Sequence, residues 1–357
     1  MPNSTFKLTA SALADFDALR DRAIKVVSER LYSSPGQEFT NFGAADKKHH
    51  RDDIGVHLDF LRTVLDTGAL DPYIDYLRWF SELLAFRNIP TKSIVKTMVI
   101  TGDFFVAEMR QEGRTVERAV SAATLAYQQQ LLRPPEVLPT PWPQQAAMED
   151  ALLRGDRKAA MDIFTQLLLE GIPAVDINVR VVEAAMCRIG ERWQRNEVTM
   201  AQEHLATATA RTVVTDAFVT LQPKAPNGLK ALFAAVQGNQ HAVGLNMVAD
   251  AFEQEGWQVQ YLGADMPTLD LVQHIVQWRP DLVGLSVSFA HQVPQARQVV
   301  ESLRAAFPVK CPQLVVGGAA IKRFPALAGF IGADAFALNA IEAAANLARP
   351  DTFVSGP

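Results

Sequence analysis

The sequence has few cysteines, no long hydrophobic run and no secretory leader. Its two cysteines, Cys187 and Cys311, form no CxxC pair and cannot staple a chain of 357 residues, which is typical of a reducing compartment. Stretches of about 18 apolar residues without a charge are absent, which excludes a membrane-spanning helix. Because residues 1–30 lack the apolar core of a signal peptide, we expect a cytoplasmic protein that does not bind a membrane.

Positive charge is also scarce, and this narrows the possible partners. The formal net charge is −5, which argues against a surface that coats nucleic acid. No DNA-recognition helix or basic arm is evident before residue 145, so direct nucleic-acid binding is not expected. Hydrophobic residues make up 48% of the chain and indicate a globular protein, whose length suggests two or three domains of about 150 residues each.

Proline and glycine divide the chain into three parts. Five prolines between Arg133 and Pro143 predict an extended linker over residues 134–144. A second break carries Pro223, Pro226 and the turn signal Asn227-Gly228. The predicted domains are therefore residues 1–133, 145–222 and 229–349.

The hydrophobic period changes at the second break. Helical periodicity before the linker predicts an all-helical sensor domain, with helices near residues 10–32, 51–67, 70–88, 91–112 and 115–132. Residues 145–222 continue the helical period in about four segments, as a four-helix bundle would. After Gly228, five short apolar runs alternate with helical runs. This rhythm predicts a Rossmann-like, flavodoxin-like, five-stranded parallel α/β domain with strands at 229–236, 259–262, 282–287, 314–316 and 335–338.

The loop after the first predicted strand places a histidine close to a helix start. It runs from Gln237 to Gly244 and includes Asn239, Gln240 and His241. Gly244 is expected to let the following helix approach the sheet closely. A helix N-terminus disfavours the imidazolium form, so a neutral His241 could donate a lone pair to a metal ion. The alternative is a histidine that caps the helix or faces solvent.

Two later strands end in residues that leave room for a ligand. The third ends in Ser286-Val287-Ser288 and the fourth in Gly317-Gly318. Hydroxyl groups and backbone without side chains at neighbouring strand ends would form a slot into which a long group could slide. Serine and glycine are common at strand ends, so each pair alone is a weak signal.

The combination resembles the cobalamin-binding Rossmann-like domain, which carries His-x-x-Gly, Ser-x-Ser and Gly-Gly after strands one, three and four. The resemblance covers about 120 residues. It implies that His241 is the lower ligand of the cobalt in cobalamin. It also implies that the displaced nucleotide tail inserts beside the serines and glycines. The family usually has an acidic residue two places before the histidine, and here Asn239 would orient His241 by a hydrogen bond.

A bundle in front of such a domain commonly shields the upper face of the corrin. Here Thr199 and Gln202 form a capping box that predicts a helix start at Thr199. Glu203 and His204 then fall in the first turns of that helix, shortly after Trp193. The alternative is a core tryptophan and a glutamate that merely favours the helix N-terminus.

Tryptophan followed by Glu-His resembles the cap of the light-sensing adenosylcobalamin proteins, in which these residues surround the adenosyl group. The resemblance assigns that role to Trp193, Glu203 and His204. The gene-regulating light sensors carry a histidine directly after the tryptophan, and this histidine can capture cobalt after illumination. Gln194 stands at that position here, so water or another ligand would take the open site.

The front domain carries Arg51, Asp53 and His57, followed by an aromatic face that includes Tyr76. Such a face is more often core than a cofactor site. The layout as a whole resembles the photocobilins, which bind biliverdin beside cobalamin. This resemblance implies a pocket for biliverdin edged by these four residues. Neither cysteine lies in the front domain, so noncovalent binding is implied.

The leading hypothesis is a light sensor, not an enzyme, that binds adenosylcobalamin and biliverdin. Light would cleave the cobalt–carbon bond, and loss of the adenosyl group would loosen the cap. The output would be altered assembly of a homo-oligomer, a dimer or tetramer, or binding to a separate effector protein. One alternative is a corrinoid methyl-carrier protein of a methyltransferase system, which would use the same His241. Another is a cobalamin or bilin store without photochemistry.

Overall fold

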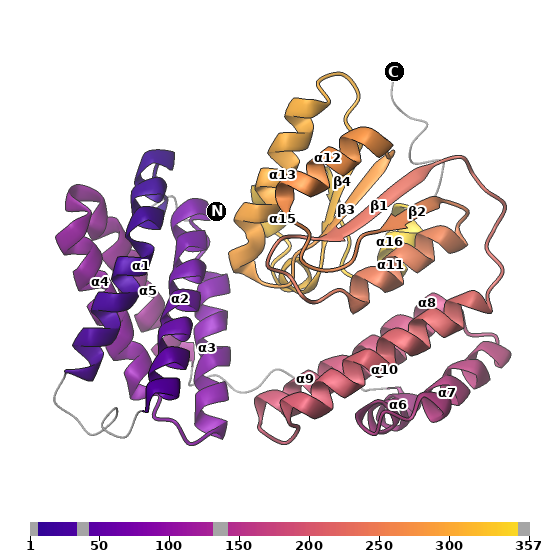
Figure 1. Ribbon diagram of the computed structural model, residues 1–357, viewed down its shortest axis with the longest axis horizontal. Helices are drawn as coiled ribbons and strands as arrows, with labels where there is room; N and C mark the ends of the chain where they lie inside the picture. The colour runs from indigo at the N-terminus through magenta and orange to yellow at the C-terminus, as the bar shows by residue number, and fades with distance from the viewer. Residues whose placement is uncertain (1–5, 34–42, 131–141, 349–357) are drawn as a thin grey trace. The chain divides into compact units, whose positions relative to one another are not determined.

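The computed structural model describes residues 6–33, 43–130 and 142–348. The chain divides into two compact units, Met1–Val137 and Leu138–Pro357 (Figure 1). Cys187 and Cys311 are free thiols. Within the described ranges, none of the helices has the length and apolar character needed to cross a membrane.

The first unit is a bundle of long helices. Its described elements are α1 Ala10–Tyr32, α2 Ala44–Thr67, α3 Asp71–Phe86, α4 Lys92–Glu108 and α5 Arg110–Gln130. Phe16 of α1 stacks on Phe105 of α4 with ring centroids 4.5 Å apart. The guanidinium of Arg20 donates two hydrogen bonds, of 2.7 and 2.9 Å, to the carboxylate of Asp59 on α2. Apolar packing and a bidentate ion pair therefore join α1 to its neighbours.

Two of the predicted helix boundaries in this unit are wrong. α2 begins at Ala44, well before residue 51. α4 ends at Glu108, and Arg110 with φ 47° starts α5 before the predicted break at 113–114. Gly113 lies inside α5, where a Cβ atom would overlap the carbonyl oxygen of Phe105. That glycine therefore allows α5 to cross closely over α4 and does not end a helix.

The second unit begins with the predicted bundle. Its helices are α6 Pro143–Leu153, α7 Arg157–Leu169, α8 Ala174–Ile177, the π-helix η2 Asn178–Glu183, α9 Ala184–Gln194 and α10 Met200–Val219. The predicted linker extended to residue 144, but α6 already starts at Pro143, because proline is tolerated in the first helical turn. Residues 134–141 of that linker lie outside the described residues.

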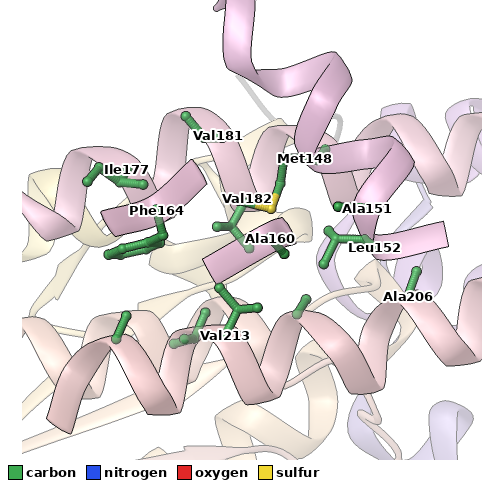
Figure 2. Close-up of a cluster of buried hydrophobic side chains, with 14 of the residues drawn as sticks. Met148, Ala151, Leu152, Ala160, Phe164, Ile177, Val181, Val182, Ala206 and Val213 are labelled. Atoms are coloured by element: carbon green, nitrogen blue, oxygen red, sulfur yellow. The ribbon is translucent and has the colours of Figure 1, made fainter. Parts of the chain in front are cut away.

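The bundle encloses a continuous apolar core. Phe164 of α7, Val182 of η2 and Val213 of α10 point toward one another in Figure 2, and each is at most 1% exposed. The helices α8, η2 and α9 follow one another without a break and form one long arm of the bundle. This arm carries Trp193 near its end.

The predicted five-stranded parallel sheet is confirmed. The strands are β1 Lys230–Ala235, β2 Gln258–Tyr261, β3 Leu282–Ser286, β4 Gln313–Gly317 and β5 Ala335–Phe336. They lie in the order β2-β1-β3-β4-β5, the flavodoxin-like arrangement, in which the order reverses between β1 and β3. The predicted fold class, an all-helical front, a helical bundle and this α/β domain, is therefore correct.

Helices cover both faces of the sheet (Figure 1). α11 Val243–Gln254 and α16 Ala340–Asn346 lie on one face, and α12 Thr268–Trp278 and α13 Val293–Ala306 lie on the other. The short helices η3 Ala290–Gln292, α14 Ala319–Arg323 and α15 Leu327–Ile331 complete the domain.

The bundle packs on the sheet's α11 and α16 side. Met247 of α11 and Ala340 of α16 belong to the bundle's own apolar core. At the rim, the ammonium of Lys322 on α14 donates a 3.0 Å hydrogen bond to Glu183 of η2. The bundle core therefore extends to α11 and α16, while the sheet residues form a second apolar cluster. The first turn of α10 lies near the loop that follows β1, because Glu203 acts on His241.

Candidate functional site

The predicted strand-end residues lie side by side at one edge of the sheet. Ala235 at the end of β1 pairs in register with Ser286 of β3, and Ser286 pairs with Gly317 of β4. Because the strands are parallel, their following loops all leave from this edge. Such an edge, next to the reversal in strand order, is the usual ligand site of open α/β sheets.

The loop after β1 turns through Gly238 and is anchored by Asn239. Gly238 has φ 82°, a conformation that glycine adopts without strain. Asn239 is fully buried, and its amide donates a 2.9 Å hydrogen bond to the carbonyl of Ser286. Its side-chain oxygen accepts a 3.0 Å bond from the backbone N–H of His241. The predicted hydrogen bond to His241 exists, but it reaches the backbone and not the imidazole ring.

Two further side chains hold this loop, and sequence reasoning missed both. Asp265, after β2, accepts hydrogen bonds from the backbone N–H of Gly238 at 2.7 Å and from the amide of Gln240 at 2.9 Å. Gln292, only 1% exposed, donates to the carbonyl of Gly238 at 3.0 Å and accepts from the backbone N–H of Ser288 at 3.0 Å. The position of Asp265 just after a strand could have indicated a role at this edge. No feature of the sequence around Gln292 indicates such a role.

His241 presents its ring at the edge. The residue as a whole is exposed, yet partial loss of solvent lowers the pKa of its imidazole below the ordinary value. The carboxylate of Glu203 on α10 acts on the same ring in the opposite direction. Phe289 meets the ring edge-on with centroids 5.2 Å apart. The lowered pKa favours the neutral imidazole, which is the form that can ligate a metal.

Gly318 and Gly244, both at this edge, have different surroundings. Gly318 has φ 97°, and a Cβ atom there would lie 2.5 Å from the carbonyl oxygen of Val287. Gly244 was predicted to let α11 approach the sheet, and this is wrong, because a Cβ atom there would meet nothing within 4 Å. Gly244 is exposed and borders open space beside His241.

The serines after β3 are also unequal. Ser286 is 5% exposed, and its carbonyl accepts the hydrogen bond from Asn239. Ser288 is partly exposed, and its backbone N–H is held by Gln292. Ser288 is therefore the more accessible of the two hydroxyl groups.

The predicted helix start in the bundle is confirmed. The Thr199 hydroxyl accepts from the backbone N–H of Gln202 at 3.2 Å, and the Gln202 side chain accepts from the backbone N–H of Thr199 at 3.0 Å. This capping box starts α10 at Met200 and places Glu203 in its first turn. The carboxylate of Glu203 is hydrogen-bonded to the ring nitrogen Nδ1 of His204 at 2.6 Å. It also accepts a 2.8 Å hydrogen bond from the hydroxyl of Thr207.

Trp193 and Gln194 end α9, directly before the connection 195–199 that leads to α10. Trp193 is half-buried and packs against the apolar core of the bundle. It therefore combines the predicted core role with one accessible face. The end of α9 and the start of α10 lie together at one end of the bundle.

Two protein families match parts of the second unit. Residues 229–348 match the B12 binding domain family, and residues 144–215 match a second family that is also described as a B12 binding domain. These are the sheet domain and most of the bundle. Residues 144–348, which span the two matches, are the candidate cobalamin-binding region.

Two curated relatives from one organism are similar to part of the chain. The HTH-type transcriptional repressor CarH of Myxococcus xanthus is 30% identical over 174 residues, which are 48% of this chain and 56% of the repressor. The repressor CarA of the same organism is 39% identical over 120 residues, 33% of this chain and 40% of the repressor. The chain thus spans about half the length of these two relatives.

Corrinoid proteins are also similar to part of the chain. Dimethylamine corrinoid protein 1 of Methanosarcina acetivorans is 26% identical over 200 residues, 55% of this chain and 88% of that protein. The solved structure of the monomethylamine corrinoid protein of Methanosarcina barkeri aligns at 22% identity with a TM-score of 0.47, over 56% of this chain and 93% of that one.

The strand-end residues of the cobalamin-binding region fit a cobalamin. An accessible imidazole with a lowered pKa is a suitable ligand for cobalt. Gly244, three residues after His241, borders open space. Gly318, where no side chain can be accommodated, and the accessible Ser288 border the neighbouring strand ends.

The residues predicted for a bilin lie in the first unit, on α2 and α3. His57 and Tyr76 are 7% and 6% exposed, and their rings meet edge-on at 5.3 Å. Asp53 is close enough to Tyr76 to affect the pKa of its hydroxyl, and burial raises the pKa of Asp53 itself to about 6. Arg51 is exposed and lies beside Tyr32 instead.

The aromatic face beside these residues packs as core. Phe60 stacks on Tyr76 with ring centroids 4.0 Å apart, and Phe80 meets the ring of His57 edge-on at 4.9 Å. This face therefore packs as an apolar core, which was the predicted alternative to a cofactor site. Two polar atoms inside it, His57 Nδ1 and the Tyr76 hydroxyl, are buried without a hydrogen-bond partner in the described part of the chain.

Proposed function

We propose that the chain is a light-sensing receptor that holds adenosylcobalamin between the bundle and the strand-end edge, with His241 as the cobalt ligand from the sheet side. The proposal is supported most directly by the proximity of Glu203 to His241: the Glu203 carboxylate acts to raise the pKa of that ring against the larger effect of burial, so the start of α10 lies near the ligand loop. The similarity to CarH and the order Trp193, Glu203, His204 support the same choice.

Each residue has a defined task in this proposal. The Asn239, Asp265 and Gln292 hydrogen bonds hold the loop so that His241 stays at the edge. Glu203 and His204, bonded to each other, and the accessible face of Trp193 would contact the upper group. Bound adenosylcobalamin supplies a cobalt–carbon bond that light breaks. Loss of contacts to the upper group would then weaken the packing of α9 and α10 at that end of the bundle.

The decisive experiment is an absorption spectrum before and after green light. We expect the chain loaded with adenosylcobalamin in the dark to convert to a cob(III)alamin-type spectrum within minutes of illumination. His241→Ala should lower cobalamin retention about tenfold or more and remove the histidine-ligated spectrum. His274→Ala, on α12, is the matched control and should retain both. A His241→Ala spectrum identical to that of the wild type would place the ligand elsewhere.

A corrinoid methyl carrier is the second candidate, favoured by the 88% coverage of the dimethylamine corrinoid protein. This function predicts methylation of the bound corrinoid only with a partner methyltransferase, and no change of assembly in light. Stable dark and light spectra together with partner-dependent methylation would therefore replace the light-sensing proposal. A store without photochemistry would show cobalamin binding and neither response.

We further propose biliverdin as a second chromophore, bound noncovalently by the first unit. The support is the pair of buried unpartnered polar atoms, His57 Nδ1 and the Tyr76 hydroxyl, in an aromatic cluster near Asp53. A tetrapyrrole would offer pyrrole N–H donors and carbonyl acceptors to these atoms. Arg51, at the surface, interacts with Tyr32, whose hydroxyl is bonded to His50.

Co-production with a source of biliverdin tests this second proposal. We expect red absorbance that co-purifies with the chain and survives in His241→Ala, because that residue lies in the other unit. Tyr76→Phe, which removes only the hydroxyl, should weaken bilin binding or shift its absorbance. A colourless product would leave the first unit as a helical scaffold.

A further inference from the structure

An open surface groove runs between α4 and α5 in the first unit. The two helices lie side by side (Figure 1), and they are antiparallel, because Gly102 meets Glu117 while the earlier residue Met98 meets the later residue Thr124. All of the lining residues of the groove come from these two helices. The other sides of the pair are occupied, since α1 packs against α4 and α3 packs against α5. The groove therefore lies on the outer side of the α4–α5 pair.

Large apolar side chains are exposed along this groove. Val99 on α4 and Leu125 on α5 line it and are 54% and 59% exposed. They are the two most exposed large apolar side chains in the described part of the first unit. Val106 is also exposed and lies two helical turns after Val99, on the same face of α4. Exposed apolar side chains that gather on one face, with polar residues around them, are typical of an interaction surface.

Two charges of opposite sign flank Val99 on α4. Lys96 lies three residues before it and Asp103 four residues after it, so all three share one face of the helix. Neither charged side chain has an ion pair or a hydrogen bond in the described part of the chain. Asp103 is exposed and lines the groove together with a second carboxylate, that of Glu117. The groove therefore offers charges of both signs that its own helices leave unpaired.

The order of these charges does not favour an isolated α4. Lys92 is the first residue of the helix and Lys96 lies one turn later, whereas Asp103 lies in its second half. A helix dipole favours anions near the N-terminus and cations near the C-terminus, which is the reverse of this order. A second α4 that runs in the opposite direction has the complementary order, because its lysines lie beside the acidic half of the first.

We propose that the α4–α5 groove binds the same groove of a second copy of this chain. In a two-fold symmetric contact one patch meets itself, so each pair of contacts occurs twice. With two antiparallel α4 helices that cross at Val99, Lys96 of each copy would lie opposite Asp103 of the other. The two Val99 side chains would meet at the axis, with Leu125 beside them. This interface goes beyond cobalamin binding and light sensing, and it does not depend on either.

Charge complementarity favours a second copy over other partners. An acidic partner or an anionic membrane would place negative charge against Asp103 and Glu117, whereas a basic partner would place positive charge against Lys96. The groove of a second copy presents both signs in the reversed order, so every charge meets its opposite. No other partner needs to be assumed to explain the pattern.

The size of the surface predicts a weak dimer. α4 has 17 residues, so the helix is about 25 Å long, and two neighbouring helices are about 20 Å wide. The contact would bury roughly 500 Å² of each copy, which is less than the about 800 Å² of a standard interface. We therefore expect an equilibrium between monomer and dimer that depends on concentration.

Charge reversal in the full chain tests the interface. Sedimentation would be measured in the dark, without cobalamin, over a wide range of concentration. Lys96→Glu and Asp103→Lys should each raise the dimer dissociation constant about tenfold or more, because two attractive pairs become repulsive. The double variant Lys96→Glu/Asp103→Lys restores opposite charges and should return the constant to within about threefold of the wild type. Lys25→Glu, at an exposed position of α1, is the matched control and should leave it unchanged.

A cysteine at the proposed axis tests the geometry. The background is the variant Cys187→Ser/Cys311→Ser, which removes both native thiols. Because a residue on a two-fold axis meets its own copy, Val99→Cys should form a disulfide between two chains when copper phenanthroline is added as the oxidant. Leu169→Cys, at a position that is 85% exposed on α7, is the control and should crosslink about tenfold more slowly.

Three outcomes would overturn the proposal. A chain that stays monomeric at every concentration would show that the groove does not bind a second copy. Equal dissociation constants in the wild type, Lys96→Glu and Asp103→Lys would place any dimer interface elsewhere. A double variant as weak as the single variants would show that these two charges do not face each other. If Lys96→Glu does not fold, Asp103→Lys and Val99→Cys still test the contact. The light-dependent spectrum is unaffected by any of these results, so failure here and failure of the proposed function are distinguishable.

Discussion

At the residue scale, Gly318 is a position of the strand-end edge that cannot accept a side chain. Its φ of 97° is strained for any other residue, and a Cβ atom would also lie 2.8 Å from the backbone nitrogen of Val287. Gly318→Ala should lower the free energy of unfolding by about 2–4 kcal/mol, because both backbone strain and overlap act. Urea denaturation of the second unit, followed by circular dichroism, would measure this loss.

A matched glycine provides the control. Gly329 lies in the helix α15 with ordinary φ, and a Cβ atom there would meet nothing within 4 Å. Gly329→Ala should therefore be neutral or stabilise by about 0.5–1 kcal/mol through helix propensity. If both variants lost the same stability, steric exclusion at Gly318 would not be the cause.

Asp250 makes the stability of the second unit depend on pH. Its pKa is about 7 in the folded chain, against an ordinary value of 3.8. Between these values the folded state holds a proton that the unfolded state has lost, so this residue makes stability fall as pH rises from about 4 to 7. Asp250→Asn keeps the side chain neutral and should raise the free energy of unfolding by about 1–2 kcal/mol at pH 8.

The difference in stability between Asp250→Asn and the wild type should become small at low pH. At pH 4, Asp250 is protonated in the folded state, so Asp250→Asn should differ from the wild type by much less than at pH 8. Melting temperatures at pH 4, 6 and 8 would measure the difference. A gain that is equal at every pH would mean that the carboxyl is not titrating in this range.

At the scale of the element, α10 connects the cap residues to the sheet domain. Its first turn carries Glu203, and its later residues belong to the core that includes Met247 of α11. Thr199 satisfies free N–H groups at the start of this helix through the capping box. Thr199→Ala should therefore lower the free energy of unfolding by about 1 kcal/mol and loosen the first turn. Denaturation and amide hydrogen exchange over residues 200–204 would measure the two effects.

Thr212→Ala is the control within the same helix. Its hydroxyl donates a 3.1 Å hydrogen bond to the carbonyl of Ala208 in the helix interior. Because alanine is the better helix former there, this change should be neutral or slightly stabilising. Equal destabilisation by both variants would show that the capping box contributes nothing specific.

At the scale of the whole molecule, the proposed light response is a change in assembly. The cap contacts of one ring-sized group bury about 100 Å², which corresponds to about 2–3 kcal/mol. A shift of that size can reverse a marginal equilibrium between oligomers. We expect adenosylcobalamin-loaded chain to elute at different volumes in gel filtration before and after green light. Chain loaded with hydroxocobalamin, which carries no adenosyl group, should elute at one volume in both conditions.

The element types and the edge of the site could be predicted from the sequence, because they follow from local patterns. The hydrophobic period and the positions of proline and glycine located the helices and strands. Parallel strands then bring the residues that follow them to one edge of the sheet. The roles of single glycines were less predictable, both at helix boundaries and in contacts between helix and sheet. Gly113 allows two helices to cross and does not end one, and Gly244 borders open space and does not contact the sheet.

Other parts of the site could not be predicted, because they depend on contacts between distant residues. Gln292 reaches the carbonyl of Gly238 across 54 positions, and Asp265 reaches the backbone N–H of the same residue across 27. Arg51 is close to Asp53 in sequence but faces Tyr32, because neighbours on a helix point in different directions. Proximity along the chain therefore says little about which side chains meet.

By itself the sequence determined the order of helices and strands, the capping box of α10 and the histidine at the first strand end. All of these depend on residues within a few positions of one another. Only the tertiary structure decided that Glu203 lies close enough to His241 to act on the pKa of its ring, and that the side chain of Asn239 bonds the backbone of both His241 and Ser286. These features depend on contacts between elements that are far apart in the sequence, and local pattern does not encode which side chains of two packed elements face each other.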